Sequence, residues 1–130
     1  VGAVTLGLDL TLRDLQDQLK GKGQPWERAK AFDGACVLAD WVDVSEVKAW
    51  DQVTFNLQVN DEVRQQGDTG LLIFNIGYLL AEISQVFTLE VGDVVMTGTP
   101  AGVAALAQGD QLTMTLNGQT QDFIWHTFVK

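Results

Sequence analysis

Residues 7–32 read GLDLTLRDLQDQLKGKGQPWERAKAF and combine a strand, a helix and a loop in close succession. The strand is predicted over residues 3–9, where the run is apolar enough for burial on both faces and Asp9 is its one carboxylate. Three leucines then recur at helical spacing and predict a short helix over residues 12–20, which Gly21 and Gly23 end. This stretch therefore begins a domain that mixes strand and helix.

The helix and the loop behind it are framed by residues that favour helix starts. Thr11 is the predicted N-cap, and Asp14 three residues later completes a pair that resembles a capping box. Pro25 opens a second helical turn, since its missing N–H and fixed φ suit the first helical position. Lys30 is expected inside that turn, in the apolar company of Phe32 and two alanines.

Four polar groups stand out in this stretch: a carboxylate, a guanidinium, an amide and an amine, from Asp9, Arg13, Gln16 and Lys30. Together they have the chemistry to bind an anionic small molecule and a hard metal ion, although one carboxylate is not a complete metal site. The competing interpretation is that Arg13 and Gln16 belong to a solvated helix face. For Lys30 the competing interpretation is that its stem lies along an apolar surface and its ammonium reaches water. The site interpretation and these competing ones both stay open here.

The composition is that of an ordinary globular protein, with 46% hydrophobic and 19% charged residues, and it excludes a disordered chain. The net charge of −9 argues against nucleic acid and against an anionic membrane surface as partners, because phosphate contacts need clustered Lys and Arg. The single cysteine, Cys36, excludes an internal disulfide and favours a reducing compartment, the cytoplasm. We interpret it as a buried thiol rather than as a nucleophile paired with His126.

The remainder of the chain is predicted to be rich in strands. Residues 53–59 alternate between apolar and polar side chains, and a turn at Asn60–Asp61 leads to a return strand over residues 62–66, which is expected to be exposed or at a sheet edge. A second hairpin joins residues 110–117 to residues 119–129 through an Asn–Gly turn. Both patterns predict antiparallel pairs.

One longer helix and a glycine-rich loop complete the prediction. Residues 71–87 have the apolar periodicity of a helix that packs on the core. Residues 94–96 are expected as a short buried strand that runs into TGTPAG at 97–102, whose backbone N–H groups can hold a carboxylate or a phosphate. The fold class is α+β, with a β-rich mixed sheet or roll, one short and one longer helix, and a single domain over residues 1–130.

Three motifs, taken in order, resemble the fumarylacetoacetate hydrolase family. They are DLTLRDLQ at residues 9–16, PWERAKAFD at residues 25–33 and GDVVMTGTPAGV at residues 92–103. The chain is most similar to the branch of acylpyruvases, fumarylpyruvate hydrolases and hydroxymuconate isomerases. The resemblance implies a β-rich fold around a divalent metal, Mg²⁺ or Mn²⁺, and a homodimer that acts on a small 2-oxo or β-diketo acid.

The resemblance also implies roles for individual residues. Asp9 matches the aspartate metal ligand of the family. Arg13 and Gln16 match positions that face the substrate or brace the metal site. Lys30 matches the lysine that contacts the substrate and the metal-bound water, and it is the expected catalytic residue together with these two.

The implied substrate-binding residues are Thr97, Gly98 and Thr99. Thr99 matches the threonine that binds the carboxylate end of the substrate. The hydroxyl and the exposed N–H groups of this segment are expected to fix that end of the molecule while Lys30 neutralises charge or orients water.

The chain departs from the family pattern upstream of Asp9. The family's other two metal ligands form a Glu-x-Glu pair before that aspartate, and its acid–base His and Glu also lie upstream. Residues 1–8 supply none of these groups, and His126 does not match the family's histidine. Because the sequence opens directly in a strand, we expect a catalytic domain that lacks its N-terminal part.

The resemblance implies a metal-dependent hydrolase that cleaves a C–C bond in acylpyruvate- or fumarylpyruvate-type β-diketo acids, as in aromatic catabolism. Isomerisation of hydroxymuconate-type diacids and decarboxylation of oxaloacetate-like acids are alternatives on the same fold. A non-catalytic alternative is an incomplete module that only pairs with a partner chain. The plainest alternative is a domain in which Asp9 and Lys30 form a structural ion pair.

Overall fold

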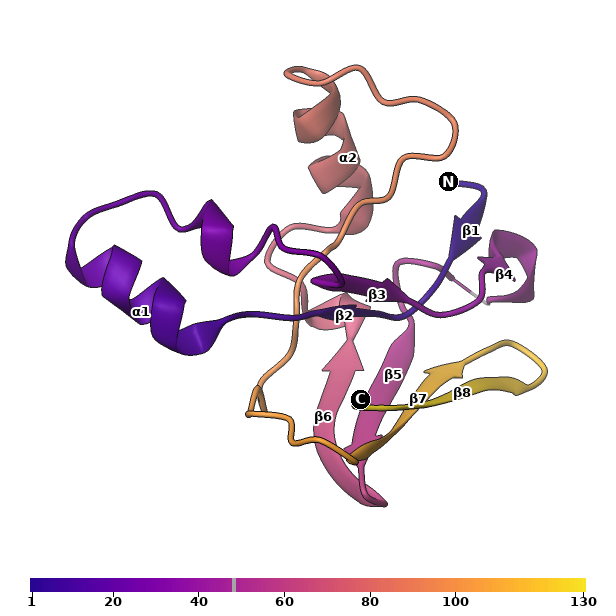
Figure 1. Ribbon diagram of the computed structural model, residues 1–130. Helices are drawn as coiled ribbons and strands as arrows, with labels where there is room; N and C mark the ends of the chain where they lie inside the picture. The colour runs from indigo at the N-terminus through magenta and orange to yellow at the C-terminus, as the bar shows by residue number, and fades with distance from the viewer. Residues whose placement is uncertain (48) are drawn as a thin grey trace. The chain divides into compact units, whose positions relative to one another are not determined.

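The computed structural model describes residues 1–47 and 49–130, and the contacts divide the chain into two units. The smaller unit consists of residues 5–40, and the larger unit consists of residues 1–4 and 41–130. Figure 1 labels the helices and strands of both units. That residues 1–130 form a single domain stays a prediction.

The smaller unit is a two-stranded antiparallel ribbon with helical residues inserted between its strands (Figure 1). Its elements are, in order, β2 at Gly7–Asp9, α1 at Arg13–Gly21, a 3-10 turn at Glu27–Ala29 and β3 at Cys36–Leu38. The helix confirms the prediction for residues 12–20, and the turn confirms the one for the segment after Pro25, although it ends at Ala29 and Lys30 follows it instead of lying inside it. Asp9 lies opposite Cys36 in the ladder, so both side chains point to the same face.

Three expectations for residues 3–9 and Cys36 are wrong. The predicted strand over residues 3–9 divides in two, because β1, Ala3–Val4, pairs with β4, Val42–Asp43, whereas β2 pairs with β3. Asp9 is exposed and β2 is not buried on both faces. Cys36 is also exposed rather than buried, since it shares the open face of its cross-strand partner.

The predicted cap of α1 is wrong as well. Leu12 occupies the N-cap position, and no side chain makes a hydrogen bond to the start of the helix. The Thr11 hydroxyl instead accepts a 2.9 Å hydrogen bond from the Nζ of Lys30. The Thr11 hydroxyl, which the capping-box pattern with Asp14 assigned to the start of the helix, is therefore bonded to Lys30 instead.

The larger unit contains a four-stranded antiparallel sheet in the order β6-β5-β7-β8 (Figure 1). Its strands are β5 at Thr54–Val59, β6 at Glu62–Asp68, β7 at Gln111–Asn117 and β8 at Asp122–Phe128. Asn60 and Asp61 join the first pair with φ values of 52° and 66°, the left-handed conformation that a tight hairpin turn requires. Both predicted hairpins and the edge position of β6 are confirmed, and every strand pair among the described residues is antiparallel.

The apolar core of this unit lies on one face of the sheet. Leu112, Met114 and Leu116 of β7 are 2%, 4% and 3% exposed, whereas the two threonines between them are half-buried. Val59 of β5 lies opposite Leu112 and is also buried. The period of two places these side chains on one face of the sheet. Pairing with β5 on one side and β8 on the other makes β7 a central strand.

The apolar segment over residues 71–87 is helical over less of its length than predicted. α2 spans Ile76–Ser84, because the Asn75 side chain accepts a hydrogen bond from the N–H of Tyr78 and so caps the helix there. No residue of α2 is buried, and Ile73 just before it is 92% exposed. The expectation of a core-packing helix is wrong for the part of the chain that the structure describes. α1 and α2 have 9 residues each, so neither is the longer one.

Residues 85–110 contain no strand and no helix. The predicted buried strand at 94–96 is wrong, since no strand pairs with it among the described residues and Val94 is 43% exposed. The hairpin between β7 and β8 closes through residues 118–121 and not through a tight Asn–Gly turn, because Asn117 pairs with Asp122. Within residues 1–47 and 49–130, no helix combines the length and apolarity needed to cross a membrane.

Candidate active site

Lys30 is the centre of a polar cluster in the smaller unit. Its Nζ lies 2.5 Å from a carboxylate oxygen of Asp9 and donates a 2.9 Å hydrogen bond to the Thr11 hydroxyl. The Lys30 and Asp9 side chains are 25% and 49% exposed, so the pair is partly open to solvent. An ammonium has three N–H donors, and these contacts use two of them.

Backbone hydrogen bonds hold the cluster in place. Asp9 is the last residue of β2, and Lys30 directly follows the 3-10 turn. The N–H of Leu12 donates to the carbonyl of Ala29 at 3.0 Å, and Ala29 itself is 0% exposed. The turn is therefore fastened to the chain that leaves β2, which brings two residues far apart in the sequence into contact.

Arg13 and Gln16 form a second polar pair on α1. The Arg13 guanidinium donates a 2.8 Å hydrogen bond to the Oε1 of Gln16, whose residue is 5% exposed. This bond fixes the orientation of the amide, so the Gln16 NH₂ is the end that is left to donate. The solvated-face interpretation is therefore wrong for Gln16, while Arg13 remains exposed.

A cavity of about 370 Å³ adjoins Lys30, at the small end of the range for ligand pockets. It is lined by Pro25, Trp26, Glu27, Lys30 and Ala31. The Lys20 ammonium lies over the Trp26 ring, 5.2 Å from the ring centroid. Sequence reasoning did not assign Trp26 to the site, because a tryptophan beside a proline has no pattern of its own.

The predicted substrate loop lies in the larger unit. Gly98 and Gly102 have φ values of 122° and 101°, so the loop turns twice through a conformation that favours glycine. The side-chain amide of Gln65 donates 2.9 Å hydrogen bonds to the Thr99 hydroxyl and to the carbonyl of Pro100. The sequence did not indicate Gln65 as a site residue, since a strand pattern does not show which distant loop its side chains contact.

The structure therefore brings together Asp9 with Lys30, and Arg13 with Gln16, all within the smaller unit. Thr97, Gly98 and Thr99 belong to the larger unit. The assembly of these three with the first four in one active site stays a prediction.

The donor set around Asp9 does not by itself fit a divalent metal. Mg²⁺ and Mn²⁺ take several oxygen ligands, and protein sites for them normally use more than one carboxylate or a bound substrate. Among the described residues, no group of three or more His, Cys, Asp or Glu side chains is placed to hold a metal ion. Asp9 can supply one ligand, and its carboxylate is already paired with Lys30.

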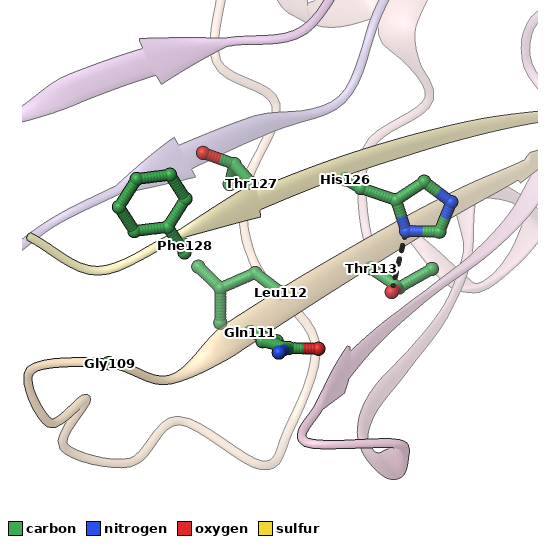
Figure 2. Close-up of a pocket in the computed structure, with 7 residues that line it drawn as sticks. All are labelled: Gly109, Gln111, Leu112, Thr113, His126, Thr127 and Phe128. Carbon is green, nitrogen blue, oxygen red and sulfur yellow. Dashed lines mark hydrogen bonds between the residues drawn. The ribbon is translucent and has the colours of Figure 1, made fainter.

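A second cavity, of about 420 Å³, lies on the β7–β8 hairpin of the larger unit (Figure 2). Figure 2 shows the His126 ring on β8 joined to the hydroxyl of Thr113 on β7, with 3.0 Å between that oxygen and Nδ1. The lining residues are Gly109, Gln111, Leu112, Thr113, His126, Thr127 and Phe128, and none of them is a predicted site residue. This cavity lacks the carboxylate and ammonium groups that the predicted chemistry needs.

The family of the chain follows from a direct comparison. Residues 1–122 match the model of the fumarylacetoacetate hydrolase C-terminal family, so the chain belongs to that family. The fold class and the resemblance inferred from the three motifs are confirmed.

Two curated proteins that are similar to this chain have different activities. An oxaloacetate tautomerase of Escherichia coli is 50% identical over 116 residues, which covers 88% of this chain and 53% of the relative. A mitochondrial oxaloacetate decarboxylase of Dictyostelium discoideum is 34% identical over 122 residues, which covers 94% of this chain and 56% of the relative. The chain thus spans about half the length of the curated relatives it matches.

Solved structures agree with the fold. A fumarylacetoacetate hydrolase family protein of Yersinia pestis is 43% identical, with a TM-score of 0.91 over 99% of this chain and 58% of that one. The fumarylpyruvate hydrolase of Pseudomonas aeruginosa, solved with Mn²⁺ and pyruvate, is 33% identical, with a TM-score of 0.82 over 100% of this chain and 55% of that one.

Proposed function

We propose that the protein catalyses the keto–enol tautomerisation of oxaloacetate or a closely similar 2-oxo diacid. The observation that carries the proposal is the Lys30 ammonium, held by Asp9 and Thr11 at the edge of a cavity of about 370 Å³. Half of the aligned residues are shared with an oxaloacetate tautomerase, which favours this isomerase reaction over the hydrolysis expected from the motifs. The reaction removes the enol O–H proton and adds a proton at C3, so it needs no oxidant and no second substrate.

Lys30 is assigned the stabilisation of negative charge. In both directions of the reaction the 2-oxygen carries developing negative charge while the proton at C3 is in transit. A preorganised ammonium beside that oxygen lowers the barrier because it does not have to reorganise during the reaction. The contacts to Asp9 and Thr11 restrict the Lys30 side chain to one position, and its third N–H can reach the substrate.

The remaining site residues are assigned to binding and orientation. The buried Gln16 amide, oriented by Arg13, presents its NH₂ as a donor to a carbonyl or a carboxylate. Thr97, Gly98 and Thr99 are assigned to one carboxylate of the substrate, because hydroxyl and backbone N–H groups in a turn can hold an anion. Two points of attachment fix the diacid relative to Lys30.

A divalent metal, Mg²⁺ or Mn²⁺, and a homodimer belong to the same proposal. The fumarylpyruvate hydrolase structure contains Mn²⁺, and Asp9 is the one ligand that we assign in this chain. One carboxylate does not complete the coordination shell of such an ion, and we assign no further ligand among the described residues. Leu71 and Ile73, which are 82% and 92% exposed, are apolar surface that an oligomer can cover. The exposed free thiol of Cys36 supports a reducing compartment such as the cytoplasm.

A second candidate reaction is decarboxylation of the same substrate class, which the likeness to an oxaloacetate decarboxylase favours. Hydrolysis of acylpyruvate-type β-diketo acids is a third, favoured by the likeness to a fumarylpyruvate hydrolase. All three reactions pass through an enolate beside a carboxylate, so Lys30 and the glycine-rich loop have the same tasks in each. Product analysis separates them.

The test uses the longest polypeptide that the gene encodes, incubated with Mg²⁺ and, in turn, enol oxaloacetate, keto oxaloacetate and an acylpyruvate. Loss of enol absorbance without CO₂ release supports the tautomerase. Release of CO₂ from oxaloacetate instead identifies the decarboxylase, and release of pyruvate from the acylpyruvate without CO₂ identifies the hydrolase. Asp9→Asn is expected to abolish turnover, while Asp17→Asn, on the exposed side of α1, is the matched control. No activity on any of the three substrates would leave the non-catalytic module as the better account.

A further inference from the structure

We propose that Gln65 is the positioning residue for Thr99, and that it turns the Thr99 hydroxyl proton toward the carboxylate of the bound 2-oxo acid. The inference rests on the proposed function, because it names the residue that prepares the substrate loop for that carboxylate. Gln65 lies on β6, far from the loop in sequence, and none of the motifs includes it.

Hydrogen-bond directions carry the argument. A glutamine amide has two N–H donors, and those of Gln65 go to the Thr99 hydroxyl and to the Pro100 carbonyl, each at 2.9 Å. The Thr99 oxygen therefore accepts a hydrogen bond from Gln65. A threonine hydroxyl has one proton, so that proton has to point away from the amide and is available to an acceptor on the other side.

The loop is seated on β6 at the same place. Gly102 has a φ of 101°, and a Cβ at this position would meet the carbonyl oxygen of Arg64, the neighbour of Gln65. The backbone of the loop and the backbone of β6 thus approach closely. The Gln65 side-chain amide links them through its hydrogen bonds to Thr99 and Pro100. Gln65 is half-buried, as expected for a side chain that is enclosed between strand and loop.

The exposed Thr99 hydroxyl is then a donor held in advance for an anion. A hydroxyl that rotates freely loses conformational freedom when it binds a carboxylate, and one that is already oriented does not. Hydrogen bonds to charged groups are also the stronger kind. Gln65 accordingly affects ligand binding through Thr99, without touching the ligand.

The test compares three single variants by calorimetric binding of oxalate in the presence of Mg²⁺, in the longest polypeptide that the gene encodes. Gln65→Ala leaves the Thr99 hydroxyl able to donate but no longer orients it, so it is expected to weaken binding by about two- to tenfold, the cost of ordering one side chain. Gln65→Glu has nearly the same shape but offers only acceptors, so it draws the Thr99 proton toward itself and is expected to weaken binding further. Gln66→Ala, at the exposed neighbouring position of β6, is the matched control and is expected to bind as the wild type does.

A double-mutant cycle separates positioning from general support of the loop. Thr99→Val removes the hydroxyl and keeps the shape of the side chain. In that background Gln65→Ala is expected to have no further effect on binding, because the group through which Gln65 acts is gone. Urea unfolding of every variant shows whether it is folded, and Gln65→Glu remains informative if Gln65→Ala does not fold.

The outcomes distinguish this inference from the proposed function. Suppose that the wild type binds oxalate. The positioning role is then overturned if Gln65→Ala binds oxalate equally well, or if it weakens binding by the same factor in the wild type and in Thr99→Val. In either case the proposed function stands. If the wild type binds neither oxalate nor oxaloacetate, the proposed function fails and the inference fails with it.

Discussion

Replacing Lys30 by methionine tests whether its contact with Asp9 serves chemistry or only stability. The two side chains are 25% and 49% exposed, and ion pairs this open to water contribute about 0–1 kcal/mol to stability. The hydrogen bond to Thr11 adds roughly 1 kcal/mol. Lys30→Met keeps the length and apolar stem of the side chain, so we expect the free energy of unfolding to fall by no more than about 2 kcal/mol.

The effect on catalysis is expected to be much larger than the effect on stability. Removing one preorganised group that faces developing negative charge typically lowers kcat by about 10²–10³-fold. Urea unfolding and oxaloacetate tautomerisation are measured on the same preparation, with Lys22→Met, at an exposed position just after α1, as the control. A variant that keeps tautomerase activity within a few fold of the wild type, or that unfolds without urea, would contradict the role given to Lys30 and favour a structural ion pair.

Three further predictions concern the larger unit. Gly102→Ala is expected to weaken oxalate binding and to destabilise the protein by about 1–3 kcal/mol, because φ is 101° and the new Cβ would meet the Arg64 carbonyl; calorimetry and urea unfolding measure both. Leu112→Ala, at a side chain 2% exposed, is expected to cost roughly 2–5 kcal/mol in urea unfolding. The Ala107 N–H donates a hydrogen bond to the Asp110 carboxylate and holds the pKa of Asp110 below its ordinary 3.8. The ionised Asp110 carboxylate therefore stabilises the folded protein above pH 3.8, and this stabilisation is lost as the pH falls through the lower pKa of the folded state. Asp110→Asn is therefore expected to show a shallower loss of stability in acid, and an unchanged acid profile would contradict this assignment.

Much of the fold and of the residue list follows from local sequence patterns. The alternation over residues 53–59 and the turn at Asn60 predict a hairpin because both signals lie within a few residues of each other. The leucine spacing of α1 is equally local. The three motifs identify the family because they combine specific residue types at specific spacings, and the family match over residues 1–122 confirms them.

Local patterns failed where a distant segment competes for the same group. Thr11 matches an N-cap by sequence, yet its hydroxyl accepts a hydrogen bond from Lys30, which no short window contains. Residues 71–87 have a helical period throughout, but Asn75 offers a cap and the helix starts there. The periodicity describes which side chains are apolar and does not say what covers them.

By itself the sequence determined the family, the class of fold and the residues Asp9, Arg13, Gln16 and Lys30 as candidates, since each of these depends on residue type and spacing. Only the tertiary structure decided that Asp9 and Lys30 touch and that Gln65 holds Thr99. The physical reason is that a hydrogen bond or an ion pair depends on the separation and direction of two atoms. The folded backbone sets both, and residue types along the chain do not.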